Sequence, residues 1–68
     1  MTNPNAEHRM LRYFAYEHLP AGPLQETSKL FHQLAVRVAE LYANDPAEQT
    51  VSLRKLLEAK DCAVRCVL

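Results

Sequence analysis

Hydrophobic residues recur every three or four positions through two long stretches of the chain, and this spacing predicts two helices. The first should run from about Pro23 to Ala43, because Pro23 suits a first helical turn and the segment NDP stops the helix. Its apolar face is predicted to consist of Leu24, Thr27, Phe31, Leu34, Ala35, Val38 and Tyr42.

The second stretch should extend from about Pro46 to the C-terminus. Asp45 is placed to cap this helix, with Pro46 at its first position and Glu48 three residues after the cap, close to a capping-box pattern. Lys60 falls near the centre of the apolar stripe. The stripe itself is predicted to comprise Leu53, Leu56, Leu57, Val64 and Val67, with Ala63 at its margin.

The segment before these helices predicts a small additional element. Residues 6–19 are typical of a short helix or turn-rich helical arm that ends before Pro20, and the loop PAGP then leads into the first long helix. No segment alternates apolar and polar residues as a strand does. The predicted fold is therefore all-α: an antiparallel αα-hairpin preceded by a short N-terminal helical arm, with residues 1–5 disordered and 6–68 one domain.

The size of the chain favours self-association. Sixty-eight residues with 49% hydrophobic content but only 7% aromatic residues provide a thin core. A second apolar surface is predicted on the side of the last helix opposite its main stripe, and Leu30 and Leu41 widen the face of the helix before it. Such surfaces usually mark protein–protein contacts, so a homo-oligomer is expected; a monomer with a loosely covered core is the alternative. The residues of the second surface are Val51, Ala59, Cys62 and Cys66.

Composition and motifs exclude several classes of function. Eight basic and eight acidic residues give a formal charge of zero, which disfavours DNA binding. No apolar run approaches the ~20 residues of a membrane span and no signal peptide is recognisable, so a soluble, cytoplasmic protein is expected. The motifs of common enzymes are missing, and no catalytic residue, cofactor or metal is predicted. Cys62 and Cys66 are interpreted as small apolar side chains in a reducing compartment.

The arm holds an aromatic cluster next to a guanidinium group. Arg12, Tyr13, Phe14 and Tyr16 lie within five residues. One interpretation is that the rings cover the open end of the hairpin. The other is a stacking platform, on which an aromatic face meets a nucleobase while a nearby cation meets phosphate. Both can hold together, with Phe14 inside and Tyr16 facing outward. His32 is interpreted as a solvated or interface side chain.

Four cations are candidate ligand contacts. Lys29 lies one step off the apolar face of its helix, and Arg54 and Arg65 lie toward one flank of the last helix. Arg65 lies in the last turn of its helix, where a positive charge interacts favourably with the helix dipole. This interaction alone would explain an arginine at that position. Lys60 cannot be a buried, unpaired ammonium, because that would cost several kcal/mol. It must extend to solvent, pair with a carboxylate such as Glu26 or Glu40, or line a polar pocket between subunits.

The segments RYFAYEHLP, LFHQLA and AEQTVSLRKLLEAKDCAVR, in this order around a proline break, resemble the phage helical-hairpin family shared by anti-CBASS and anti-Thoeris sponge proteins. The resemblance spans roughly residues 12–67. It implies a hexamer with ligand pockets at subunit interfaces, which binds cyclic nucleotide immune signals in the host bacterial cytoplasm and sequesters them without cleavage.

The resemblance also implies roles for individual residues. Tyr16 would stack on the base of a cyclic dinucleotide, Lys29 would meet its phosphate, and Arg65 would contact the phosphates of a cyclic trinucleotide. Two positions depart from the family pattern: Gln49 stands beside Thr50 where relatives carry a basic residue, and Cys62 stands where some carry an aromatic one. The complete predicted ligand-binding set is Tyr16, Lys29, Thr50, Arg54, Lys60 and Arg65. The alternative function is an oligomeric helical protein–protein interaction module or inhibitor without a small ligand.

Overall fold

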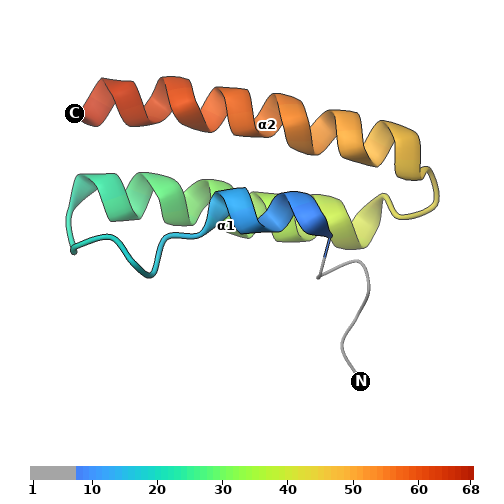
Figure 1. Cartoon of the computed structure of the whole chain (residues 1–68), viewed down its shortest axis with the longest axis horizontal. Coiled ribbons are helices and arrows are strands. Elements are labelled where there is room, and N and C mark those ends of the chain that lie inside the picture. The colour runs from blue at the N-terminus through green and yellow to red at the C-terminus, as the bar shows by residue number, and fades with distance from the viewer. Residues whose placement is uncertain (1–7) are drawn as a thin grey trace.

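Two long helices and one short helix make up the part of the chain, residues 8–68, that the computed structural model describes. The 3₁₀ helix η1 spans Arg9–Phe14, α1 spans Pro23–Leu41 and α2 spans Pro46–Val67. Figure 1 shows α2 returning alongside α1, with η1 in front of α1; η1 contacts both long helices. No strand occurs in residues 8–68, and the prediction of an all-helical chain with two packed helices is confirmed. The predicted disorder of residues 1–5 lies outside the described residues.

The N-terminus of α1 is set by a glycine and fixed by side-chain hydrogen bonding. Gly22 precedes the helix with φ 141°, in a region that glycine adopts without steric penalty. Its carbonyl accepts the first helical hydrogen bond, from the Glu26 N–H at 3.0 Å. Gln25 Nε2 donates to the Leu19 carbonyl at 2.9 Å, so the turn before the helix is tied to its first turn.

The predicted start of α2 is confirmed. Asp45 caps the helix by accepting the Glu48 N–H on Oδ1 at 3.2 Å, and Pro46 lies in the first turn. The end of α1 is two residues earlier than predicted, at Leu41. The Tyr42 N–H still donates to the Val38 carbonyl, but the chain then turns, because the Asp45 N–H donates to the Tyr42 carbonyl at 3.3 Å.

The arm is less regular than predicted. Only residues 9–14 are helical, since Ala15 adopts an extended conformation with ψ 144°. His8 caps η1 by accepting the Met10 N–H on Nδ1 at 3.1 Å. Because Nδ1 accepts, the proton of the neutral ring is on Nε2, which donates to Thr50 Oγ1 at 3.2 Å. The cap of η1 is therefore also a tie to α2.

A small core joins the three helices. Phe14 and Leu53 are completely buried, so the prediction that Phe14 points inward is confirmed. Ala35 and Ala39 of α1 are also fully buried, and their short side chains allow neighbouring elements to approach closely. Partly buried residues packed against this core are Met10, Phe31, Val36, Val38, Leu56 and Leu57.

The buried face of α1 differs from the predicted one. Leu34 and Tyr42 were expected inside but are 51% and 53% exposed, whereas Ser28 and Ala39 are buried. The face that packs is thus centred on small side chains, because the arm and α2 both press against this side of α1. In α2, Val67 was also expected inside but is 41% exposed as the last residue of the helix.

A buried glutamine joins the two long helices. Gln49 is 5% exposed, and its Nε2 donates to the Ala39 carbonyl at 2.7 Å. The Ala39 carbonyl belongs to the last turn of α1, where carbonyl groups have no partner within the helix. Gln49 therefore satisfies an acceptor at the C-terminal end of α1 from the first turn of α2.

The thinness of the molecule leaves apolar side chains uncovered. It measures 36 × 26 × 15 Å, so its shortest dimension little exceeds the ~10–12 Å diameter of one helix. Leu30 is 66% exposed and Leu41 is 52% exposed. Val51, Ala59, Cys62 and Cys66 are exposed too, as predicted for the second surface of the last helix. None of the helices within residues 8–68 is long and apolar enough to cross a membrane.

Candidate ligand-binding surfaces

Two of the predicted ligand contacts lie together at the start of α1. Lys29 Nζ lies 5.9 Å from the centroid of the Tyr16 ring. The His32 ring packs edge-on against the same tyrosine, with centroids 5.1 Å apart and an interplanar angle of 63°. Lys29 and His32 are three residues apart on one helix, so both can meet a ring supplied by the arm. We call Tyr16, Lys29 and His32 the tyrosine cluster.

His32 is not the solvated side chain that the sequence suggested. It is half-buried, and its Nδ1 is buried without a hydrogen-bond partner among the described residues. The Tyr16 ring covers part of the imidazole, and no periodicity within α1 could have predicted this long-range packing. The predicted contact of His32 with another subunit remains a prediction. Within the chain, the edge-on contact between His32 and Tyr16 orients the tyrosine ring.

A carboxylate next to the tyrosine cluster orders the turn. Glu17 Oε2 accepts the Tyr16 N–H at 3.4 Å. The pKa of Glu17 is lowered from the ordinary value of 4.5, chiefly because its own main-chain N–H donates to the carboxylate. Desolvation raises the pKa in opposition, while the Tyr16 N–H and the nearby His32 and His18 lower it further. The ionised carboxylate is thus the form that the turn favours.

Lys60 lies in a different place from the tyrosine cluster. Its Nζ donates to the Tyr13 carbonyl at 2.8 Å and lies 5.7 Å from the centroid of the Phe14 ring. Neither Glu26 nor Glu40 pairs with it in the described chain, and Glu40 instead pairs with Arg37 at 3.0 Å. Of the three alternatives for Lys60, pairing with a carboxylate is therefore not observed among the described residues.

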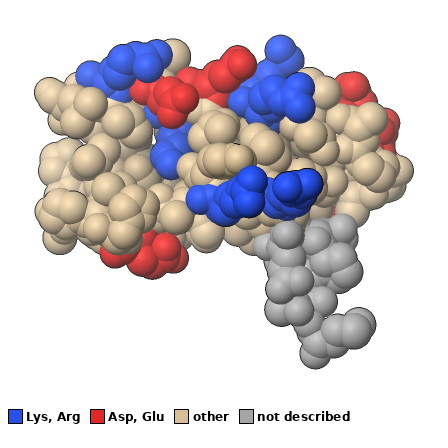
Figure 2. Space-filling view, viewed as in Figure 1, with Lys and Arg blue, Asp and Glu red and all other residues tan. Residues whose placement is uncertain are grey.

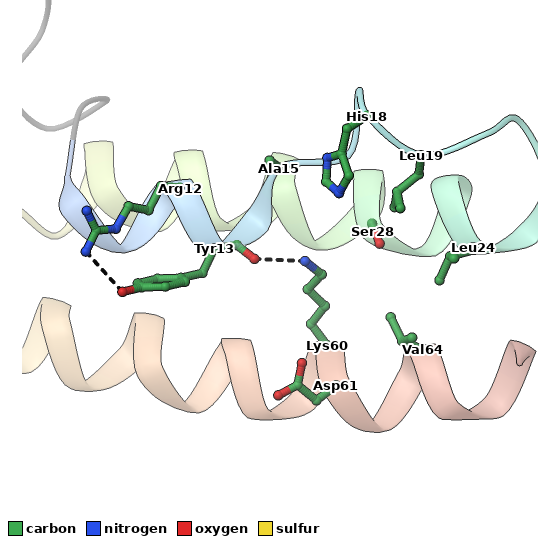
Figure 3. A pocket seen from close by; sticks show the side chains of 10 residues that line it. All are labelled: Arg12, Tyr13, Ala15, His18, Leu19, Leu24, Ser28, Lys60, Asp61 and Val64. Atoms are coloured by element: carbon green, nitrogen blue, oxygen red, sulfur yellow. Dashed lines mark hydrogen bonds between the residues drawn. The ribbon is translucent and has the colours of Figure 1, made fainter.

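An open cavity of about 300 Å³ lies beside Lys60. Figure 3 shows the lysine crossing from α2 toward the end of η1, with the His18 ring and the Leu24 side chain farther along the cavity. Arg12 and Asp61 also line it. Arg12 donates to the Tyr13 hydroxyl at 3.1 Å and not to a carboxylate. Lys60 therefore reaches a cavity within a single chain; the pocket between subunits, one of the three alternatives for this residue, remains a prediction.

The other predicted ligand contacts lie apart. Thr50 binds His8, and Arg54 is exposed on α2. Arg65 is exposed and its Nη2 lies 3.3 Å from Cys62 Sγ. The described chain thus brings Tyr16 and Lys29 together and gives Lys60 a separate cavity, but does not bring Thr50, Arg54 or Arg65 to either.

The charge pattern of the surface fits local and not general anion binding. On the face that carries η1, basic side chains gather over η1, and acidic and basic groups alternate along α2 (Figure 2). Within residues 8–68, no three His, Cys, Asp or Glu side chains lie close enough to hold a metal ion. Both cysteines are exposed free thiols.

Sequence reasoning missed His18, Ser28 and Asp61, which line the cavity, and His8, which ties the arm to α2. Asp61 could have been found from the sequence, because it directly follows Lys60, the lysine that lies in the apolar stripe. His18 and Ser28 come to the cavity only through the path of the chain after η1, and His8 meets Thr50 only because η1 packs against α2.

No family model matches the chain, and no curated protein or solved structure matches it.

Proposed function

We propose that this protein is a sponge, which binds a cyclic nucleotide-type immune signal and sequesters it without cleaving it. The observation that carries the proposal is the meeting of Tyr16 and Lys29, with the ammonium 5.9 Å from the ring centroid. An aromatic face supplies about 1–3 kcal/mol per stacked base, and a cation nearby can meet the phosphate. The ligand would be a cyclic di- or trinucleotide or a cyclic ADP-ribose isomer.

The tyrosine cluster suits such a ligand in two respects. The edge-on contact with His32 holds the ring before binding, which lowers the entropy lost when a base stacks on it. Lys29 lies at the outer limit of cation–π distance and pairs with no carboxylate in the described chain. The lysine can therefore turn to a phosphate while giving up little interaction energy.

Sequestration requires affinity and no chemical step. When binding sites exceed the messenger, the free messenger falls to the order of the dissociation constant, and a nanomolar constant corresponds to about −12 kcal/mol. One half-buried tyrosine and one exposed lysine cannot supply this alone. We therefore infer that a second subunit of a homo-oligomer, a hexamer in the proposed form, completes each site. Arg54 and Arg65 are available for this role because they are exposed and contact neither the tyrosine cluster nor the cavity. Thr50 lies on the same helix, with its hydroxyl accepting from His8.

The exposed leucines of α1 support self-association. Leu30 and Leu34 are 66% and 51% exposed on adjacent turns, and Leu41 follows seven residues after Leu34. Leucines at heptad spacing are typical of a helix that packs against another helix. The same leucines favour the alternative function, an interaction module or inhibitor that binds another protein and no small ligand.

Calorimetric titration with cyclic dinucleotides, cyclic trinucleotides and cyclic ADP-ribose isomers tests the proposal. We expect sub-micromolar binding of at least one of them, and intact ligand after the protein is denatured. Tyr16→Ala and Lys29→Met should each weaken binding at least tenfold, about 1.4 kcal/mol. Tyr42→Ala and Lys55→Met, at exposed positions on other surfaces, are matched controls and should bind normally.

Light scattering separates the two functions. A double variant Leu30→Lys/Leu34→Lys should reduce the oligomer to a monomer and lose ligand binding, whereas Gln33→Lys on the same helix should not. An oligomer that binds none of the tested nucleotides would support the interaction module. A chain that is monomeric at all concentrations would rule out a site shared between subunits.

A further inference from the structure

The cavity beside Lys60 is formed within one chain by distant parts of the sequence. The end of η1 and the following turn line one side, and α1 and α2 line the rest (Figure 3). Its volume of about 300 Å³ is at the lower limit for small-molecule pockets. This volume suits one small ring with a charged group better than a cyclic dinucleotide.

Lys60 gives the cavity a cation with unused donors. An ammonium has three N–H groups, and only one donates within the described chain, to the Tyr13 carbonyl. The side chain is half-buried, and the ammonium lies 5.7 Å from the centroid of the buried Phe14 ring. A half-desolvated cation without an anionic partner binds an incoming anion more strongly than a fully solvated one.

The other ionisable residues that line the cavity are Arg12, His18 and Asp61. The Arg12 guanidinium points away from Lys60 and is held by the Tyr13 hydroxyl (Figure 3). Asp61 is the one carboxylate among the lining residues and accepts no hydrogen bond from Lys60. The Lys60 ammonium is therefore the cation that the cavity presents to an anion.

The remaining walls are apolar. Leu24 of α1 and Val64 of α2 approach the cavity from its two sides, with Leu19 on the turn (Figure 3). Ser28, which is 1% exposed, adds a hydroxyl group at the base. The cavity thus offers a cation at one end and a short apolar slot at the other.

We propose that this cavity binds a compact organic anion, which places its carboxylate or phosphate group on Lys60 and its apolar body between Leu24 and Val64. This site is distinct from the tyrosine cluster in position and in the size of its ligand. It needs no second subunit. The proposal therefore stands or falls independently of the sponge.

Phenyl phosphate and benzoate are suitable probes, with inorganic phosphate and phenol as their half-molecules. Titrated into the full ¹⁵N-labelled chain, at least one of the two whole probes should shift the amide signals of Tyr13, Ser28, Lys60 and Val64 with a millimolar or lower dissociation constant. Binding of both probes indicates a general anion site, and binding of phenyl phosphate alone indicates selectivity for phosphate. Phenol and inorganic phosphate should bind at least tenfold more weakly.

Two variants locate the binding. Lys60→Met retains the length of the side chain but removes the ammonium, and should weaken the bound probe at least tenfold, whereas Lys55→Met on the exposed side of α2 should not. Val64→Phe fills the apolar slot and leaves the Lys60–Tyr13 hydrogen bond in place, so it tests the site even if Lys60→Met loosens the arm. The proposal is wrong if neither probe shifts these signals, if phenol binds as well as phenyl phosphate, or if Val64→Phe binds normally.

Discussion

The ammonium group of Lys60 donates a 2.8 Å hydrogen bond to the main-chain carbonyl of Tyr13, 47 residues earlier in the chain. This bond joins α2 to the end of the arm, directly beside the buried Phe14 ring. It explains why a lysine stands near the centre of an apolar stripe. The charged tip reaches a main-chain acceptor and a cavity, while its methylene groups pack along the helix.

Removing that ammonium should loosen the arm. Lys60→Met should lower the free energy of unfolding by about 1 kcal/mol, less than the usual value for a charged hydrogen bond because the site is half exposed. Hydrogen exchange of the Leu11 and Phe14 amides should accelerate more than exchange in α1. Equal acceleration throughout the chain would show that Lys60 does not act on the arm. Lys55→Met is the control in urea unfolding.

Gln49 should be the polar residue whose loss most destabilises the described chain. Gln49→Leu preserves volume but leaves the Ala39 carbonyl buried without a donor, which should cost about 1–3 kcal/mol. Gln33→Leu, at an exposed position of α1, should change stability by less than about 0.5 kcal/mol. Chemical denaturation measures both. A Gln49→Leu protein as stable as the wild type would mean that water replaces the amide.

Adjacent aromatic residues of η1 should differ sharply in importance. Phe14 is completely buried, so Phe14→Ala should cost about 3–5 kcal/mol, enough to unfold a domain of marginal stability. Tyr13 is 48% exposed, and Tyr13→Ala should cost less than about 1 kcal/mol. Thermal unfolding followed by circular dichroism compares them. Similar losses at the two positions would contradict the packing of the arm.

Glu17 should make stability depend on acid pH. Its pKa in the folded chain lies below the ordinary value of 4.5, so the unfolded chain binds the proton first. The stabilisation is present above about pH 4.5 and is lost as the pH falls through the lowered pKa. Glu17→Gln should remove this part of the acid dependence. A titration of the Glu17 carboxyl by NMR that gives a pKa of 4.5 or higher would contradict the interpretation.

The sequence predicted features that depend on neighbours along the chain. The cap formed by Asp45 and the first-turn position of Pro46 follow from local hydrogen bonding and steric fit, and the structure has both. Burial of Phe14 agrees with the interpretation that a ring of the arm covers the open end of the hairpin.

Features that depend on packing were predicted less well. Large apolar residues were assigned to the interior, but close approach of the helices selects Ala39 and Ser28 and leaves Leu34 outside. Glutamine is usually a surface residue, so the sequence did not indicate that Gln49 is buried. Its burial depends on the hydrogen bond from its amide to the Ala39 carbonyl, which has no partner within α1. Tyr16 and Lys29 were paired by family resemblance; the periodicity of α1 gave no sign that His32 would join them.

The ties between the arm and α2 bear on the order in which the protein can be completed. His8 meets Thr50, 42 residues later, and Tyr13 meets Lys60 after a similar interval. The arm is synthesised before α2, so the rings of the arm have no partner in α2 until α2 itself has been made. Closure of the arm therefore waits for α2, because it joins residues whose synthesis is separated by 42 and 47 positions.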